Sequence, residues 1–410
     1  MNSGDIAWVL IASALVLFMT PGLAFFYGGM DRSRNVLNML MMNFWCLLTI
    51  PILWVIIGYS IAGGNFDGSW FGGFDAAFLN NINIASDDGV ASLLTVIFLG
   101  MFAVITPALI SGAVADRMKF AAWALFAPIW MLLVFAPVFK WVYGGWLGVR
   151  GSLDFAGGTA IHVNAGIAAL VAVVILGKRK GWPKEGHPPH SMPLVMIGTG
   201  ILWFGWFGFN AGSALGANGQ AVQAFMNTFL AAAAAGLAWA ITERIKDGHI
   251  TNLGAASGIV AGLVAITPAC GYVSSMSAIF IGLAAGLVCC FAVHMKFRAG
   301  YDDALDVVGV HLVGGLVGSL MIGLFADAEY FGAEHMSGLF YGGGFRLLGE
   351  QAIANGVTIV YSAVVTALIL LALKATVGLR VSEEEENVGL DISEHAETAY
   401  HADDTIMERA

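Results

Sequence analysis

Residues 154–166 read DFAGGTAIHVNAG, which places His162 in an apolar segment that begins with an acid and small residues. Residues 306–318 read DVVGVHLVGGLVG and place His311 in a similar setting. An ionisable side chain in the hydrocarbon of a bilayer is costly, and such residues usually belong to functional sites. The two stretches therefore predict one functional site that is built from two parts of the chain.

The composition of the chain is that of a membrane protein. Of its 410 residues, 58% are hydrophobic and only 11% are charged, and the mean hydropathy is +0.80. This balance excludes a water-soluble globule. We expect an all-α polytopic protein with eleven transmembrane helices, at about residues 6–27, 37–62, 91–113, 120–138, 156–176, 192–212, 221–243, 251–267, 276–295, 303–325 and 352–376.

The positions of Lys and Arg predict the orientation. If residue 1 lies outside, 15 of the 18 Lys and Arg residues fall inside, and only Lys140, Arg150 and Arg346 fall outside. Because cytoplasmic loops are rich in basic residues, we expect the N-terminus outside and the C-terminus inside the cell membrane. The first span follows Asp5 and exceeds 20 residues, so we interpret it as a retained helix and not as a signal peptide.

Residues 381–410 form an acidic tail behind a membrane domain at residues 1–380. The tail has ten acids and one Arg, so it holds −9 of the net charge of −10, and the membrane domain has no attraction for nucleic acid. This charge pattern favours a disordered, solubilising cytoplasmic end. Docking on the membrane domain stays open because of four apolar positions, Val388, Leu390, Ile392 and Tyr400.

A weak internal repeat relates the two halves of the membrane domain. AVITPA at 103–108 returns as VAITPA at 264–269, and this pair, like the two histidine stretches, lies five spans apart. An odd offset reverses the direction of a helix through the membrane, so we expect inverted five-helix repeats with the site at their interface. The repeats would cover about 1–180 and 190–326, followed by a final helix at about 352–376.

The depth of the two histidines tests this arrangement. His162 lies eight residues from Asp154 at the outer end of its span, and His311 lies eight residues from Asp303 at the inner end. At 1.5 Å per residue both are roughly 12 Å deep, from opposite faces of a core about 30 Å thick. A lone buried His is most often a packing residue. Two facing imidazoles can instead share an N–H···N hydrogen bond and still turn one nitrogen each towards a guest.

Aromatic and polar residues accompany the histidines. Phe98 and Phe102 share one helix face, and alone they indicate only core or lipid contact. Residues 203–214 read WFGWFGFNAGSA, where glycines favour close helix packing and Ser213 places a hydroxyl one turn from Phe209. Asp154 most simply caps the start of its helix, and the alternative is that its charge favours a cation in the outer mouth.

Together these stretches resemble the ammonium transporter family (Amt/Mep/Rh), closest to its prokaryotic Amt branch. The resemblance implies eleven helices in two inverted halves, a homotrimer with one pore per subunit, and ammonium or methylammonium as substrate. It also implies that the tail packs under neighbouring subunits and that a cytoplasmic PII-type regulatory protein binds the inner face. The stretches that support it are MFAVITPALISGA, DFAGGTAIHVNAG, FGWFGFNAGSAL, DVVGVHLVGG and VGLRVSEEEENVGLDISEHAETAYH.

The resemblance also assigns roles to residues of this chain. Phe102 and Phe209 would form the stacked gate at the outer end of the pore, and Phe98 and Trp206 would line its approach. Ser213 would hold ammonium in the outer vestibule, and Asp154 would be the acid required near that site. His162 and His311 would be the twin pore histidines.

One departure concerns the vestibule. The family usually has a Trp-Gly-Gly-Gly-Trp run there, whereas this chain has Trp141-Val-Tyr143-Gly-Gly-Trp146, one glycine shorter. Tyr offers a weaker cation–π surface than Trp. Either Tyr143 serves, or a local shift brings Trp141 or Trp146 into the vestibule.

We therefore expect a transporter and not an enzyme, with no cofactor and no metal. Ammonium would bind in the vestibule, lose a proton, and cross as ammonia beside the histidines, and the proton could follow separately. Two alternatives are a membrane redox protein with His162 and His311 as axial haem ligands, and an ammonium sensor with little flux. His187-Pro-Pro-His190 could bind a metal, but a solvated turn is the simpler interpretation.

Overall fold

The computed structural model describes residues 2–63, 70–80 and 82–400, and these residues form helices and loops with one isolated bridge between Met118 and Arg380. Ten helical segments are long and apolar enough to cross a membrane, which confirms an all-helical, multi-pass protein. They are Ser3–Met30, Val36–Gly63, Asp87–Val114, Phe120–Arg150, Gly158–Leu176, Met192–Gly212, Gly219–Asp247, Ser275–Ala299, Val308–Phe325 and Arg346–Thr376.

Four spans contain a π-helical turn. In two of them a proline stands three residues earlier, Pro51 before Trp54 and Pro128 before Met131. A proline lacks the N–H that would continue the regular hydrogen-bond ladder, so the turn widens there. The composite spans are α2 (Val36–Leu53), η1 (Trp54–Gly58) and α3 (Tyr59–Gly63); α5 (Phe120–Trp130), η4 (Met131–Phe135), α6 (Ala136–Val142) and α7 (Trp146–Arg150); η5 (Gly158–Val163) and α8 (Asn164–Leu176); η6 (Val308–Leu312) and α14 (Val313–Phe325).

The other spans are mostly single helices, and short helices lie in the loops. The spans are α1 (Ser3–Met30), α4 (Asp87–Ser111) with η3 (Gly112–Val114), α9 (Met192–Gly212), α10 (Gly219–Asp247), α12 (Ser275–Ala292) with α13 (Met295–Ala299), and α16 (Arg346–Thr376). The loop helices are η2 (Ala77–Leu79), α15 (Ala328–Phe331) and η7 (Leu339–Tyr341).

The predicted span at 251–267 is a helix of only 15 residues, α11 (Asn252–Ile266). Its length is roughly 22 Å at 1.5 Å per residue, less than the hydrocarbon thickness. α11 ends just before Pro268, which lacks the N–H that would continue the hydrogen-bond ladder. α11 packs against α9, α10, α12 and α14, and most of its residues are buried.

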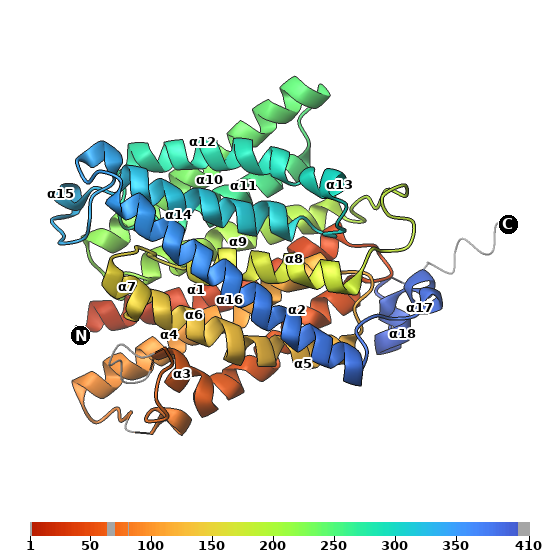
Figure 1. Cartoon of the computed structure of the whole chain (residues 1–410), viewed down its shortest axis with the longest axis horizontal. Helices are drawn as coiled ribbons and strands as arrows, with labels where there is room; N and C mark the ends of the chain where they lie inside the picture. Colours follow the sequence, from red (N-terminus) through yellow and green to blue (C-terminus); the bar gives the residue numbers. More distant parts are fainter. Residues whose placement is uncertain (1, 64–69, 81, 401–410) are drawn as a thin grey trace.

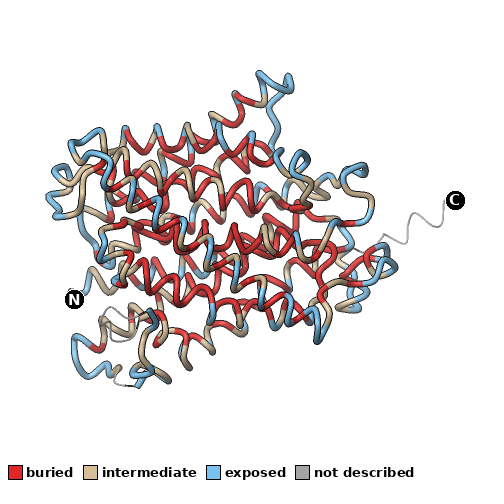
Figure 2. The backbone as a smooth tube through the Cα atoms, in the orientation of Figure 1, coloured by how far each residue is buried: buried red, intermediate tan, exposed pale blue. Residues whose placement is uncertain are grey.

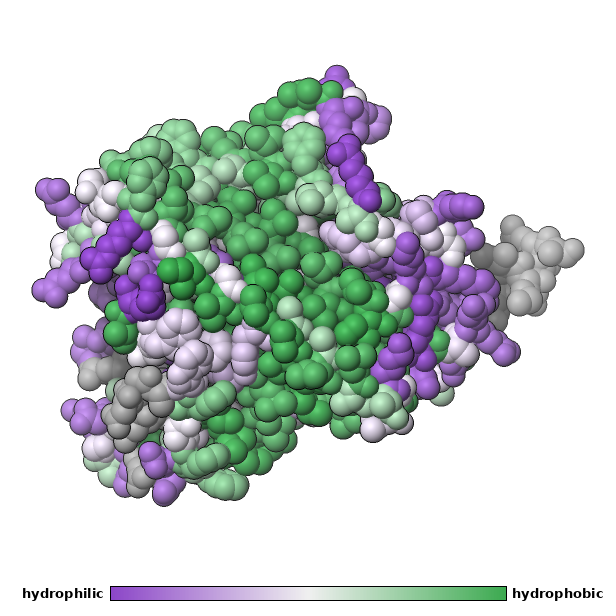
Figure 3. All heavy atoms as spheres, viewed as in Figure 1, coloured by the Kyte–Doolittle hydropathy of each residue, from purple (hydrophilic) through white to green (hydrophobic). Residues whose placement is uncertain are grey.

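The long helices lie side by side along one axis (Figure 1). α1 begins at one end of the molecule, and the tail helices lie at the other. Buried residues run through the middle of the bundle, whereas exposed residues concentrate at its two ends (Figure 2). The surface follows the same division, with an apolar band between two polar ends (Figure 3). This is the division that a bilayer requires of a protein spanning it.

Glycines set the close contact between α1 and α9. A Cβ atom at Gly198 would lie 2.4 Å from the backbone nitrogen of Phe26, and one at Gly22 would lie 2.6 Å from the side chain of Ile201. Neither position can hold a larger residue without a shift. The small-residue packing expected for span six is therefore present.

The tail is ordered up to Tyr400, so its interpretation as a disordered end is wrong for residues 381–400. Leu390 is fully buried, and the Asp391 carboxylate accepts the backbone N–H of Asn38 at 2.8 Å, near the start of α2. Glu386 accepts hydrogen bonds from Arg380 at 2.7 Å and from the backbone N–H of Lys180 at 2.8 Å. These contacts hold the tail against the membrane domain in spite of its negative charge. Residues 401–410 of the tail lie outside the described residues. Its two helices are α17 (Glu383–Val388) and α18 (Leu390–His395).

Candidate functional site

The two histidines meet inside the bundle, as the sequence predicts. The Nδ1 atoms of His162 and His311 are 3.2 Å apart, and their rings are nearly parallel, with centroids 5.3 Å apart. Both side chains are buried, with 1% and 3% exposure. At this distance one Nδ1 donates its hydrogen to the other. The Nε2 atom of His162 is buried and has no hydrogen-bond partner among the described residues.

Local structure explains how the histidines come together. Each lies in a π-helical turn, η5 for His162 and η6 for His311, which is a common feature of functional sites. The two turns approach each other closely because glycines, which have no side chain, lie at the contact between them. A Cβ atom at Gly166 would lie 2.4 Å from the backbone nitrogen of Leu312, and one at Gly315 would lie 3.0 Å from the carbonyl oxygen of Gly158.

Trp206 fixes the ring of His162 from the side of α9. The two rings are stacked with centroids 5.5 Å apart, and Trp206 Nε1 donates to Thr267 Oγ1 at 2.8 Å. The histidines border a narrow cavity of about 10 Å³, which is roughly the space of one water molecule. Its other lining residues are apolar or aromatic: Met19, Leu23, Ile105, Leu109, Ile161, Leu202, Trp206, Phe209 and Val260.

Two phenyl rings border this cavity towards the end of the bundle at which α1 begins, which is called the outer end from here on. Phe102 of α4 and Phe209 of α9 have centroids 4.3 Å apart, and Phe98 packs edge-on against Phe102 at 4.9 Å. All three side chains are almost fully buried. The two rings to which the family resemblance assigns a gate are thus in contact, although their helices are distant in the chain.

A larger cavity of about 160 Å³ lies on the other side of these rings. Tyr143 and Ser213 both line it. Ser213 Oγ donates to the carbonyl oxygen of Phe209 at 2.8 Å, which leaves its oxygen lone pairs available to a guest. The ring of Tyr143 packs against Phe139 at 4.5 Å. The other lining residues are Phe98, Leu99, Phe102, Phe139, Phe155, Ala156 and Leu215.

The alternative vestibule residues Trp141 and Trp146 do not line this cavity. Trp141 Nε1 donates to the carbonyl oxygen of Trp70 at 2.7 Å, and its ring packs edge-on against Tyr361. Trp146 packs against Trp70 as well. Of the three residues left open by the sequence, only Tyr143 faces the cavity.

Asp154 caps the start of η5, as its simpler interpretation predicts. Its two carboxylate oxygens accept four backbone N–H groups, from Gly157, Gly158, Thr159 and Ala160, at 2.7–3.1 Å. The carboxylate is buried and does not line the outer cavity. Any effect of its charge on a cation must therefore act through space.

A third cavity, also of about 10 Å³, continues from His311 towards the opposite end. Tyr27, Ser257 and Asp306 line it. Asp306 Oδ1 pairs with Lys296 Nζ at 2.6 Å. Asp306 is thus part of a charge pair. The helix cap is instead Asp303, whose Oδ2 accepts the N–H of Val308 at 2.7 Å.

Several residues of this pathway were missed in the sequence. Tyr27, Ser257 and Lys296 come from three segments that only tertiary packing brings to the inner cavity. Phe139 is different, because it precedes Tyr143 by one helical turn and the spacing could have linked the two.

This fold and site define a class of protein. A multi-pass helical bundle encloses a file of three cavities, with a pair of contacting phenyl rings and a buried histidine pair between its ends, and this is the architecture of a channel-like membrane transporter.

Comparisons with known proteins identify the family within this class to which the chain belongs. The profile of the Ammonium Transporter Family matches residues 7–400, so the chain belongs to this family. It is 51% identical over 410 residues to an ammonium transporter of Aquifex aeolicus, covering 98% of this chain and 94% of that protein. It is 50% identical to an ammonium transporter of Mycobacterium tuberculosis, covering 97% and 90%. The crystal structure of Candida albicans Mep2 is similar with a TM-score of 0.88 and 34% identity, over 98% of this chain and 92% of that one.

Proposed function

We propose that this ammonium transporter binds NH4+ in the outer cavity, removes one proton, and passes NH3 through the narrow path beside the histidines. The observation that supports this mechanism most is the hydrogen-bonded pair of His162 and His311 in a cavity of about 10 Å³. A space of that size admits one small guest and excludes a hydrated ion. A bare cation there would lose its hydration at an effective cost of several kcal/mol, which favours the neutral species.

The outer cavity is the proposed recruitment site. The aromatic faces of Tyr143 and Phe102 attract a cation, and the Ser213 oxygen accepts a hydrogen bond from it. K⁺ is similar in size but donates no hydrogen bond, so it gains less from Ser213. Asp154 lies at the start of η5 and adds a negative charge to the outer half of the protein.

The histidine pair also offers a route for the proton. Because the two imidazoles share one hydrogen bond, a proton accepted on one ring can be released from the other. The proposed transport is therefore electrogenic, with NH3 and H⁺ crossing along the same pair of residues.

Two rival functions fit the geometry less well. A haem iron cannot lie between two axial nitrogens that are only 3.2 Å apart and hydrogen-bonded to each other. A sensor without flux would need only the outer cavity, whereas the file of cavities continues past the histidines to Asp306.

We also propose a topology for the chain. The short α11 would complete eleven crossings, with the N-terminus outside, the C-terminus inside, and inverted repeats at about 1–180 and 190–326 before the final helix α16. The distribution of Lys and Arg supports this orientation. Labelling of Ser3→Cys and Ser393→Cys in intact cells tests it. A membrane-impermeant maleimide should label only the first, and labelling of the second would contradict the topology.

The proposed assembly is a homotrimer in the cell membrane, with a PII-type protein as the regulator of its inner face. The support is the family resemblance and an exposed apolar hollow beside α10, which contains Val222, Phe225 and Phe229. Native mass spectrometry of the purified protein should give three subunits. A monomer that transports at full rate would contradict the trimer.

Transport measurements test the mechanism itself. Proteoliposomes on a solid-supported membrane should give a transient current when NH4+ is added and none when K⁺ is added at the same concentration. Equal currents from the two ions would contradict recruitment by hydrogen bonding and cation–π attraction.

A further inference from the structure

A polar cavity of about 480 Å³ lies outside the conduction pathway, at the end of the molecule where the tail docks. Two loops form it, one after α1 and one between α8 and α9. The tail contacts both loops, because Asp391 N donates to the carbonyl oxygen of Arg34 and Tyr400 Oη lies 2.9 Å from His190 Nε2. The volume is within the range of small-molecule sites. The lining residues are Arg32, Ser33, Arg34, Glu185, Gly186, His187, Pro188, Pro189 and His190.

Three side chains of this cavity have hydrogen-bonding capacity that the protein does not use. Arg34 is exposed and forms no ion pair with any described residue. Arg32 pairs through Nε with Asp116 at 3.0 Å, which leaves its Nη2 buried and without a partner in the described part of the chain. His187 Nε2 is likewise buried and unpartnered. Because buried polar groups are nearly always hydrogen-bonded, Arg32 Nη2 and His187 Nε2 are two groups beside the cavity that still need a partner.

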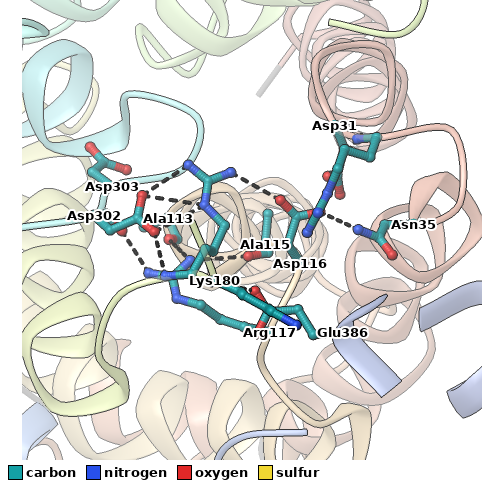
Figure 4. A network of polar contacts seen from close by, with 12 residues as sticks. Asp31, Asn35, Ala113, Ala115, Asp116, Arg117, Lys180, Asp302, Asp303 and Glu386 are labelled. Carbon is teal, nitrogen blue, oxygen red and sulfur yellow. Dashed lines mark hydrogen bonds and ion pairs between the residues drawn. The ribbon is translucent and has the colours of Figure 1, made fainter. Parts of the chain in front are cut away.

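The charges behind the cavity are those of a buried network at the ends of several spans (Figure 4). Arg179 bonds both Asp116 and Asp302 at 2.9 Å. Burial and the nearby Asp116 raise the pKa of Asp31 well above its ordinary value. Burial, then the positive charges of Arg179 and Arg32, lowers the pKa of His187. The two arginines act on His187 more strongly than the opposing carboxylates of Asp116 and Asp302, so an anion is favoured beside it.

The chemistry of the lining side chains indicates which class of anion the cavity would bind. A guanidinium presents a planar fork that matches two oxygens of a phosphate. Glu185 is the acidic residue among the lining side chains, and it would repel a bare anion but accept a hydrogen bond from a hydroxyl group. The volume exceeds that of phosphate alone. The lining thus fits a phosphate ester that has hydroxyl groups beside its phosphate.

We propose that this cavity binds a phosphate ester, with the phosphate on Arg32, Arg34 and His187 and a neighbouring hydroxyl on Glu185. Nucleotides and sugar phosphates have this chemistry, and so does the glycerol phosphate headgroup of an anionic lipid. The site is separate from the histidine conduit, so the proposal does not depend on the mechanism of conduction.

Calorimetric titration of the full-length protein in phosphatidylcholine nanodiscs tests whether the ligand is a soluble phosphate ester. AMP should bind saturably at one site per subunit, and adenosine, which lacks the phosphate, should not. Arg34→Gln should weaken AMP binding about tenfold or more, because it removes a charge-assisted bidentate contact. Glu185→Gln should strengthen the binding of inorganic phosphate, because it removes the repelling carboxylate.

Arg298→Gln is the matched control, because Arg298 is an exposed arginine of α13 outside the cavity. It should leave AMP binding unchanged, and the ammonium-evoked current should persist in every variant and show that each is folded.

Native mass spectrometry tests whether the ligand is instead the headgroup of an anionic lipid. Retention of phosphatidylglycerol by the wild type and its loss from Arg34→Gln would support the proposal even without AMP binding. The proposal fails if neither ligand binds, or if Arg34→Gln and Arg298→Gln have equal effects.

Discussion

The roles of single residues depend on contacts, and only some of these contacts can be predicted from the sequence. His162, His311 and Asp154 could be predicted because a polar residue in an apolar segment is conspicuous, and their partners follow from helix direction. The choice among Tyr143, Trp141 and Trp146 could not be made. The reason is that the contact between Trp141 and the Trp70 carbonyl joins residues far apart in the chain. Local spacing contains no information about such a contact.

Tyr143 should govern affinity more than maximal flux. Tyr143→Ala removes a ring from the outer cavity but leaves the path beyond the phenyl gate intact. A cation–π contact contributes about 0.5–2 kcal/mol, so the apparent KM for ammonium should rise by roughly 2- to 30-fold with little change in maximal current. Trp146→Ala is the control and should leave KM unchanged. The assignment is wrong if Trp146→Ala raises KM and Tyr143→Ala does not.

Asp303 should make the stability of the protein depend on pH. Burial raises its pKa to about 6, although Lys296 acts in the opposite direction. The folded state therefore holds this proton more tightly than the unfolded state, and the associated stability is present below about pH 4 and lost as the pH rises through 6. The contribution is of the order of 1–3 kcal/mol.

Asp303→Asn isolates this effect because Asn keeps an oxygen that can accept the N–H of Val308. Thermal unfolding in detergent at pH 5 and pH 7.5 is the measurement. The wild type should lose more Tm over this interval than the Asn variant. Parallel changes in the two proteins would contradict the prediction.

At the scale of elements, the lengths of the apolar segments predicted where the helices lie. The ends of the helices depend on features that hydropathy does not measure. The final helix begins at Arg346 and not at 352, because Gln351 is fully buried and bonded to the backbone of Leu153 and to Ser319. α11 ends before Pro268 and is shorter than a regular span. Polar groups that are satisfied inside the bundle thus extend one helix, and a proline shortens another.

The glycine contact between α1 and α9 gives a test at this scale. Gly198→Ala would place a Cβ atom 2.4 Å from the backbone of Phe26, so we expect a loss of about 1–3 kcal/mol in the free energy of unfolding and a lower Tm. Gly200→Ala is the matched control on the same helix, because a Cβ atom there would meet nothing within 4 Å. Equal Tm values for the two variants would show that this contact is not tight.

At the scale of the whole molecule, composition and apolar length were enough to predict a multi-pass helical bundle, and the depths of the two histidines were enough to predict that they meet inside it. Docking of the tail was only an alternative in the sequence, because its charge pattern favours disorder, whereas Leu390 and Glu386 are buried against the membrane domain. The cavities could not be predicted either, because each is lined by side chains from several distant helices. In the proposed mechanism the path through the bundle runs beside the histidine pair, because His311 borders both narrow cavities.

The ammonium-evoked current of His162→Ala plus His311→Ala in proteoliposomes tests this central claim most directly. Positioned proton transfer commonly contributes 10²–10⁴-fold in rate, so we predict that the current at saturating ammonium falls by at least about tenfold relative to the wild type. The Trp146→Ala protein, reconstituted in the same way, should conduct like the wild type. A double variant with an unchanged current and unchanged selectivity over K⁺ would contradict the account.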